Sequence, residues 1–227
     1  VRSEQDGAAL VTQGGSAIVP LQLDVTDAVQ IAAAAARIGE ETGERGLQAL
    51  VNNAGVAVAG PLEFLPIDEL RRQLEINVIG QIAVTQAMLP LLRRARTSTQ
   101  GDHRAGRIVF MSSVSGRSAL PFTGAYAASK FALEAAADSL RVELRPFGLT
   151  VMLVEPGAIK TNFVSHATKN VSRKLDVYAG VTGAGKTTTL AMVINLLNQE
   201  GGYRIVTIEE PVEYVFPSAA GSIVTQR

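Results

Sequence analysis

The sequence contains no cysteine and no tryptophan, and only 5% of its residues are aromatic. Without cysteine the chain cannot form disulfide bonds or thiolate metal sites, and we expect a protein of the reducing cytoplasm. Neither sign of charge is in excess, because 21 Lys and Arg residues balance 21 Asp and Glu residues. This balance provides no electrostatic footprint for nucleic acid or an anionic membrane, so neither is an expected partner.

Long hydrophobic runs are also missing, although hydrophobic residues make up 47% of the chain. A membrane-spanning helix needs roughly 20 consecutive apolar residues, and the alanine tract Ala32–Ala36 is far shorter. The N-terminal residues do not have the pattern of a signal peptide. We therefore expect no membrane span, and one or two compact domains in 227 residues.

Apolar, β-rich runs alternate with helical patterns through the first two-thirds of the chain. Strands are predicted at 17–23, 47–51, 107–111 and 149–154, and helices at 26–38, 67–94 (one long helix or two) and 123–147. This alternation predicts an α/β fold in which the strands pair in parallel through right-handed crossovers. The charged stretch 93–104 is predicted to be an exposed loop.

Tyr126 and Lys130 lie four residues apart in a predicted helix, so their side chains share one face. Ser113 directly follows a predicted strand, at the kind of position that faces the ligand crevice of a parallel sheet. A lysine ammonium near a tyrosine favours the phenolate and lowers the tyrosine pKa, which prepares the hydroxyl for proton transfer. A Tyr and a Lys at this spacing are also common on ordinary amphipathic helices, so the pair alone leaves both interpretations open.

Six short motifs occur in order along the first part of the chain. They are Leu23-Asp24-Val25-Thr26, Asn52-Asn53-Ala54-Gly55, Ile76-Asn77-Val78, Ser112-Ser113, Tyr126-Ala127-Ala128-Ser129-Lys130, and Pro156-Gly157 with Thr161. In this order they resemble the classical short-chain dehydrogenase/reductase family. The resemblance implies a Rossmann-like, three-layer sandwich built on a parallel sheet over residues 1–172.

The same resemblance implies an NAD(P)-dependent oxidoreductase that acts on a secondary alcohol or ketone, in a family whose members form oligomers. Its implied catalytic residues are Ser113, Tyr126, Lys130 and Asn77, with Asn77 holding a water of the proton relay. The implied cofactor-binding residues are Asp24, Val25, Asn53, Ala54, Gly55, Tyr126, Lys130, Pro156, Gly157 and Thr161. Arg2 stands where the family often binds the 2′-phosphate of NADP, which favours NADP over NAD.

Several of these residues also have an ordinary structural interpretation. Asp24 could cap the following helix, and Gly55 could serve only as a turn residue. Asn77 could be a buried amide with satisfied hydrogen bonds, and Pro156-Gly157 could simply stop a helix.

The family's glycine-rich turn, Thr-Gly-x-x-x-Gly-x-Gly, is absent from these 227 residues. That turn places the dinucleotide pyrophosphate on a helix N-terminus. Val1-Arg2-Ser3 resembles only the end of the family's second strand, so we expect a sheet without its first strands. The predicted strand 17–23 could then pair with 47–51, stay at an edge or fail to pair. Negligible dehydrogenase turnover is the expected consequence.

A second, unrelated signature lies at Gly180–Thr187, where GVTGAGKT fits the P-loop pattern G-x-x-x-x-G-K-[ST]. Backbone N–H groups of such a loop bind phosphate oxygens, the lysine neutralises the β- and γ-phosphates, and the Ser or Thr hydroxyl ligates Mg²⁺. The predicted ATP-binding residues are Gly180, Gly183, Gly185, Lys186, Thr187 and Thr188, with Thr187 as the Mg²⁺ ligand. The alternative is a glycine-rich loop that only begins a helix.

A helix is predicted at 186–199, and strands at 203–208 and 222–225. Thr188-Thr189-Leu190 and the run YRIVTIEEPVEY at 203–214 resemble the type II and type IV secretion and pilus ATPases, with Glu210 where that family has Asp. This resemblance implies a partial P-loop α/β segment over 173–227.

Three functions therefore stay open. The chain could be a dehydrogenase impaired by truncation, an ATP-binding fragment of a motor ATPase, or a chimeric, misassembled reading frame without activity.

Overall fold

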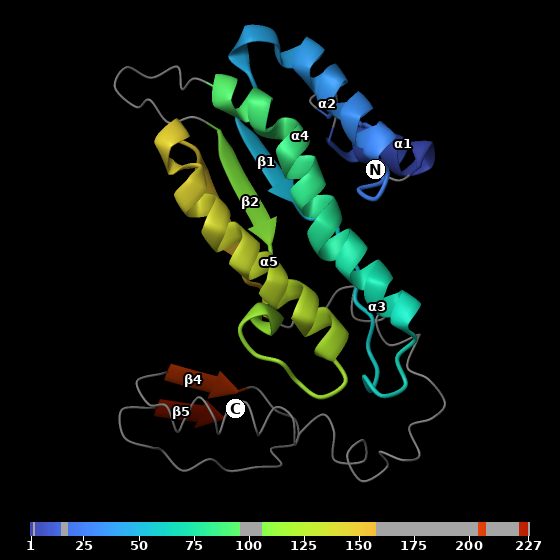
Figure 1. Cartoon of the computed structure of the whole chain (residues 1–227), viewed down its shortest axis with the longest axis vertical. Helices are drawn as coiled ribbons and strands as arrows, with labels where there is room; N and C mark the ends of the chain where they lie inside the picture. Colours follow the sequence, from blue (N-terminus) through green and yellow to red (C-terminus); the bar gives the residue numbers. More distant parts are fainter. Residues whose placement is uncertain (2, 15–17, 96–105, 158–203, 208–222, 227) are drawn as a thin grey trace. The chain divides into compact units, whose positions relative to one another are not determined.

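The computed structural model describes residues 1, 3–14, 18–95, 106–157, 204–207 and 223–226 (Figure 1). The chain divides into two compact units, Val1–Asn170 and Val171–Arg227. The first unit contains the helices α1 (Glu4–Gly14), α2 (Ala28–Thr42), α3 (Ile67–Leu74), α4 (Gln81–Arg94) and α5 (Gly124–Glu143), the strands β1 (Ala49–Asn52), β2 (Arg107–Met111) and β3 (Thr150–Val154), and the short helical turns η2 (Gly43–Arg45), η3 (Glu75–Gly80), η4 (Val114–Gly116) and η5 (Arg145–Phe147).

The sheet of the first unit is parallel, in the order β1-β2-β3. Ala49 is paired with Arg107, and Arg107 is paired with Thr150. The sequence predicted these three strands to within two residues at each end, together with their parallel pairing. Because parallel strands point the same way, the segments after β1, β2 and β3 leave the sheet at one edge.

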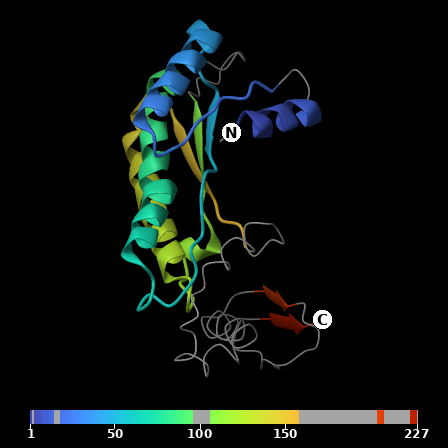
Figure 2. The same ribbon diagram turned by 90° about the vertical axis from the view of Figure 1, so that its right-hand side faces the viewer.

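The core lies between the sheet and the helices α2, α4 and α5, which share one side of the sheet in Figure 2. Its fully buried members include Leu92, Ile108, Phe110 and Leu133. On the other face, Val51 and Val154 remain 58% and 42% exposed. Figure 2 shows α1 on the opposite side from α2, α4 and α5. Because Val51 and Val154 stay exposed, the described residues do not show the complete three-layer sandwich that the resemblance implies.

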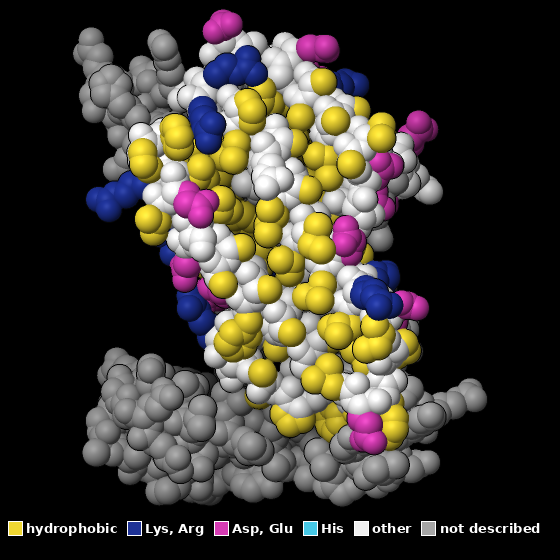
Figure 3. Space-filling model, in the orientation of Figure 1, with side chains coloured by type: hydrophobic (Ala, Val, Ile, Leu, Met, Phe, Trp, Pro, Cys, Tyr) yellow, Lys and Arg dark blue, Asp and Glu magenta, His cyan; other side chains and the backbone are white. Residues whose placement is uncertain are grey.

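The outward surface of α4 and α5 is also apolar (Figure 3). Hydrophobic side chains gather over these helices, and the charged side chains lie mainly towards the margins of this face. On α5, Phe131 and Val142 are exposed. The first unit therefore has exposed apolar surface on α4 and α5 in addition to its buried core.

The predicted strand at 17–23 is wrong for residues 18–23, the part of it that the structure describes. This segment makes only two backbone hydrogen bonds to Val1, from Leu23 N to Val1 O at 2.9 Å and from the Val1 amino group to Leu21 O at 2.9 Å. Val1 alone cannot form a β-ladder with this segment, and the chain already enters helix α1 at Glu4. The Ser3 hydroxyl starts that helix by accepting a hydrogen bond from Asp6 N at 3.2 Å.

The predicted helix 67–94 forms as α3, the single π-helical turn η3 and α4 in direct succession. It is long and apolar enough, by length and composition, to cross a membrane. In the structure it packs as a core helix, with Val84, Met88 and Leu92 buried in the cluster that covers the sheet.

The second unit contains the parallel strands β4 (Arg204–Thr207) and β5 (Ile223–Gln226), with Arg204 paired with Ile223. They overlap the strands predicted at 203–208 and 222–225. The predicted helix 186–199 and all of the P-loop residues lie outside the described residues.

Candidate active site

Ser113, Tyr126 and Lys130 come together where β2 ends and α5 begins. Ser113 follows β2 in an extended conformation, and its hydroxyl accepts a hydrogen bond from Ser115 N at 3.1 Å. The same side chain is hydrogen-bonded to the Tyr126 hydroxyl. The Lys130 Nζ lies 5.6 Å from the centroid of the Tyr126 ring. The structure thus unites the three residues that the sequence predicted to be catalytic.

The Lys130 side chain is buried, with 4% of the residue exposed. Its Nζ donates a hydrogen bond to the backbone oxygen of Met111, the last residue of β2, at 2.7 Å. Burial lowers the pKa of Lys130 to about 8, and the negative charge of Glu134 opposes this fall. The amine therefore changes charge near physiological pH.

The pKa of Tyr126 is raised, because burial of the phenol disfavours its charged form, while the hydrogen bond with Ser113 opposes this rise. The sequence analysis predicted the opposite, a lowered Tyr126 pKa, because it considered only the charge of the nearby Lys130 ammonium. Burial has the larger effect on the Tyr126 pKa, and it also disfavours the charged form of Lys130. At neutral pH the Tyr126 hydroxyl is accordingly protonated and available as a donor.

Asn77 lies fully buried in the π-helical turn η3. Its amide nitrogen donates to Val56 O at 2.9 Å and to the Ser129 hydroxyl at 3.0 Å, and its oxygen accepts from Val56 N at 2.9 Å. Ser129 in turn donates to Tyr126 O at 2.7 Å. Both amide hydrogens are used by protein acceptors, so the side chain agrees with the alternative of a satisfied buried amide and joins the segment after β1 to the start of α5.

Sequence reasoning missed three further polar residues that continue this row at four-residue spacing, Gln73, Gln81 and Thr85. Gln73 accepts from Val58 N at 2.7 Å, and Gln81 donates to Ala54 O at 2.6 Å. These contacts fix the backbone of residues 54–58. Polar residues repeating every four positions along one helical stretch, together with Asn77, were the signal available in the sequence.

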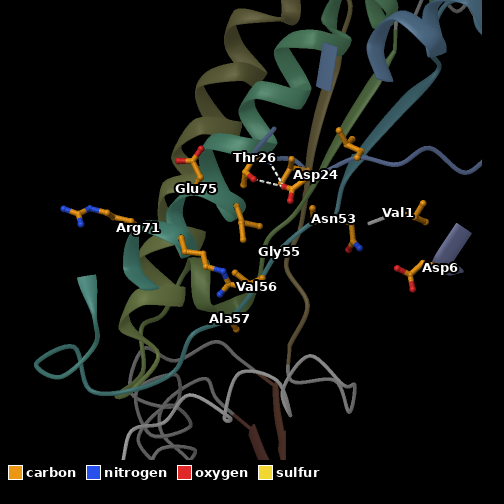
Figure 4. A pocket seen from close by; sticks show the side chains of 15 residues that line it. Val1, Asp6, Asp24, Thr26, Asn53, Gly55, Val56, Ala57, Arg71 and Glu75 are labelled. Atoms are coloured by element: carbon orange, nitrogen blue, oxygen red, sulfur yellow. Dashed lines mark hydrogen bonds between the residues drawn. The ribbon is translucent and has the colours of Figure 1, made fainter. Parts of the chain in front are cut away.

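A cleft of about 1260 Å³ opens beside this segment (Figure 4). Five of the predicted cofactor-binding residues line it, namely Asp24, Val25, Asn53, Ala54 and Gly55. Ser113, Tyr126 and Lys130 do not line the cleft, but a Cβ on Gly55 would lie 3.9 Å from Lys130 Nζ. The cleft and the catalytic group therefore meet at Gly55.

Asp24 does not cap α2, which was the structural alternative for it. The N-cap is Asp27, whose side chain accepts from Val29 N and Gln30 N. The Asp24 carboxylate accepts hydrogen bonds from the Thr26 backbone at 2.9 Å and the Thr26 hydroxyl at 2.7 Å, at the edge of the cleft. Asp27 thus forms the cap, and Asp24 orders the turn before it.

Pro156 lies beside the catalytic segment, because Val114 N donates to Pro156 O at 3.1 Å. A Cβ on the following Gly157 would meet open space. Arg2 and Thr161 lie outside the described residues, as do Gly180, Gly183, Gly185, Lys186, Thr187 and Thr188.

The parallel sheet, the Ser-Tyr-Lys group after β2 and the cleft beside β1 agree with a sequence comparison. Residues 1–172 match the family model for short chain dehydrogenase. The chain belongs to the short-chain dehydrogenase family. A separate match, to the type II/IV secretion system protein family, covers residues 161–226.

Many curated proteins are similar in sequence to this chain. "Dehydrogenase/reductase SDR family member 9" of Bos taurus is 37% identical over 177 residues, 78% of this chain and 52% of the relative. The NADPH-dependent 3-dehydrocapnine reductase of Ornithobacterium rhinotracheale is 38% identical over 161 residues, 71% of this chain and 56% of that enzyme. The chain spans about half the length of these curated relatives.

The fold of the first unit is also found among solved structures. A short-chain dehydrogenase from Streptomyces avermitilis superposes with a TM-score of 0.68 at 33% identity, covering 84% of this chain and 66% of that chain. Fold and family agree, and both place residues 1–172 in the short-chain dehydrogenase family.

Proposed function

We propose that the first unit is an NAD(P)-dependent oxidoreductase that interconverts a secondary alcohol and a ketone, with NADP preferred. The observation that carries this proposal is the hydrogen bond between the side chains of Ser113 and Tyr126, formed beside the buried Lys130 amine. The name of the NADPH-dependent 3-dehydrocapnine reductase supports the cofactor. When bound, the nicotinamide supplies or accepts the hydride.

In this reaction Ser113 holds the substrate oxygen, and Tyr126 gives a proton to it or takes one from it. Because the pKa of Tyr126 is raised, the hydroxyl is a proton donor at neutral pH, which suits reduction of a ketone. Oxidation of the alcohol needs Tyr126 as a base and is therefore favoured by alkaline conditions. Lys130 adjusts the proton affinity of Tyr126 through its own charge.

The residues present fit part of a dinucleotide. Asp24 and Val25 line the cleft on one side, and the segment Asn53–Gly55 lines it on the other. Gly55 has no side chain, and a Cβ placed on it would lie 3.9 Å from Lys130 Nζ, so this part of the cleft lining approaches the catalytic amine. These 227 residues contain no glycine-rich turn for the pyrophosphate. We expect weak cofactor binding and negligible turnover by this chain alone.

The experiment joins an N-terminal strand–turn–helix–strand unit with the motif Thr-Gly-x-x-x-Gly-x-Gly, taken from a related dehydrogenase, to this chain. Reduction of NAD⁺ and NADP⁺ is then followed with a panel of secondary alcohols, for the fused and the original chain. Turnover is expected in the fused chain, and Tyr126→Phe should abolish it while Tyr203→Phe, in the second unit, leaves it unchanged. Lys130→Met should chiefly lower the rate and raise the pH optimum. Equal activity of the Tyr126→Phe variant would contradict the assigned role.

A second candidate function rests on the other family match. We propose that residues 180–188 bind ATP or ADP with Mg²⁺, because GVTGAGKT lies inside the match to the secretion-system family. A fluorescent ADP analogue should bind the wild-type chain and not Lys186→Ala, with Lys174→Ala as the control. We expect little hydrolysis. Identical binding by the wild type and Lys186→Ala would refute a working P-loop.

A further inference from the structure

A row of buried polar side chains runs along the helical stretch that faces the segment after β1. It consists of Gln73 on α3, Asn77 in η3, and Gln81 and Thr85 on α4, four residues apart in each step. Each of the four residues is at most 1% exposed. Burying polar groups is unfavourable unless they find hydrogen-bond partners. The partners therefore show what this row holds in place.

Three members of the row bind the backbone of every second residue in the segment after β1. Gln73 accepts a hydrogen bond from Val58 N at 2.7 Å and donates one to Val56 O. Asn77 binds both backbone groups of Val56, at 2.9 Å each, and Gln81 donates to Ala54 O at 2.6 Å. Alternate residues bound along one side are the pattern of a β-strand beside its neighbour. Here side-chain amides take the place of the neighbouring strand.

The residues between them, Gly55 and Ala57, have their backbone groups on the other side of the segment. In an extended chain the N–H and C=O groups of successive residues point to opposite sides. In the part of the chain that the structure describes, neither Gly55 nor Ala57 takes part in a backbone hydrogen bond. Both residues line the cleft (Figure 4). The cleft wall thus offers two donors and two acceptors to a ligand.

Thr85, the fourth member of the row, holds a different part of the chain. Its hydroxyl accepts a hydrogen bond from the Asn52 amide at 2.9 Å and donates one to Gln81 O at 2.8 Å. Asn52 is the last residue of β1 and does not line the cleft. Thr85 therefore supports the strand, whereas Gln73 and Gln81 support the cleft wall.

We propose that Gln73 and Gln81 are positioning residues for the cofactor, because they hold residues 53–58 as a strand-like edge whose free groups, at Gly55 and Ala57, hydrogen-bond the dinucleotide. The inference rests on the proposed function in placing a nicotinamide dinucleotide in this cleft. The ribose hydroxyls of a dinucleotide both donate and accept hydrogen bonds, so they fit an edge that offers both kinds of group. Neither glutamine touches the ligand, and both act through the backbone.

A merely structural role predicts a different result. Loss of a buried hydrogen bond anywhere in the row lowers the stability of the first unit. If cofactor affinity only followed stability, Thr85→Val would weaken binding as much as Gln73→Met or Gln81→Met. If the glutamines position the cleft wall, affinity falls in the two methionine variants and stays unchanged in Thr85→Val. Methionine keeps the length of glutamine and removes its hydrogen bonds.

The first measurement needs no ligand and follows amide hydrogen exchange by NMR in the ¹⁵N-labelled intact chain. Gln73→Met removes the acceptor of Val58 N–H, so this amide should exchange about fivefold faster or more, relative to the amides of the central strand β2. Gln81→Met and Thr85→Val should leave that ratio unchanged. An unaltered ratio in Gln73→Met would overturn the role of Gln73.

The second measurement titrates NADP⁺ into the same chains. The amide resonances of Gly55 and Ala57 should shift in the wild type and in Thr85→Val with equal Kd, and the Kd should rise about fivefold or more in Gln73→Met and in Gln81→Met. Equal weakening in all three variants would show a structural role and overturn the positioning. If Gln73→Met does not fold, as judged by circular dichroism, Gln81→Met decides, and an unchanged Kd there overturns the proposal.

Failure of this inference is distinct from failure of the proposed function. Shifts elsewhere in the cleft, with Gly55 and Ala57 unmoved, would overturn the inference and leave the cofactor site in place. No shift at any residue of the wild type would contradict the proposed cofactor site and the ligand-binding edge together, and the exchange of Val58 N–H would then decide the role of Gln73 in holding the segment.

Discussion

Lys130→Met should change how the stability of the first unit depends on pH. Burial lowers the pKa of Lys130 from 10.5 to about 8, so between these values the unfolded chain binds a proton that the folded chain does not. The free energy of unfolding of the wild type therefore rises with pH in this window. Integration between pH 7 and 10 gives a gain of about 2.5 kcal/mol that the methionine variant lacks.

Tyr126 titrates at higher pH and does not disturb this comparison. Its pKa is raised by burial, so the folded state keeps its proton longer than the unfolded chain, and stability falls only above about pH 10. Both chains contain Tyr126, and below the pH range in which Tyr126 titrates the difference between them reports on Lys130.

Urea denaturation at pH 7, 8, 9 and 10, followed by far-ultraviolet circular dichroism, measures the effect. The chain has no tryptophan for a fluorescence assay, and the described helices all belong to the first unit. Parallel pH profiles for the wild type and Lys130→Met would refute the lowered pKa of a buried amine.

Two further substitutions test the packing around the site. Thr85→Val removes the acceptor of the 2.9 Å hydrogen bond from the buried Asn52 amide, and an unpaired buried donor should lower the urea-derived free energy of unfolding by about 1–3 kcal/mol. Gly80→Ala would place a Cβ 2.7 Å from Val25 O, so the backbone of the cleft must move, and we expect a lower thermal midpoint and weaker nicotinamide cofactor binding. Gly39→Ala on α2, where a Cβ would meet no atom closer than 3.4 Å, is the control. An unaltered midpoint in both test variants would contradict the contacts described.

Most of the sheet was predictable because its signals are local. β2 is an apolar run followed by Ser113, and α5 has a clear helical pattern that places Tyr126 and Lys130 on one face. Their meeting also followed from the sequence, since parallel strands deliver the segments after them to the same edge.

The failures concern properties that depend on neighbours. Residues 18–23 have a strand-like composition, but a strand needs a partner, and within the part of the chain that the structure describes only Val1 shares backbone hydrogen bonds with them. The helix α1 was not predicted, and it begins directly after Val1-Arg2-Ser3, where the Ser3 hydroxyl accepts a hydrogen bond from Asp6 N. The direction of the Tyr126 pKa depends on how deeply the phenol is buried, which a four-residue spacing cannot reveal. The ion pair between Glu134 and Arg117 likewise joins two residues that are not neighbours in the sequence.

The claim central to this account is that Ser113, Tyr126 and Lys130 form a working proton-transfer site whose turnover is limited by the absent glycine-rich turn. The most direct test is the rate of NADP⁺ reduction by the chain joined to a glycine-rich N-terminal unit, with the original chain and the joined Tyr126→Phe variant assayed beside it. The account predicts turnover in the joined chain, and none above background in the other two. Robust turnover by the original chain, or equal turnover with Tyr126→Phe, would contradict it.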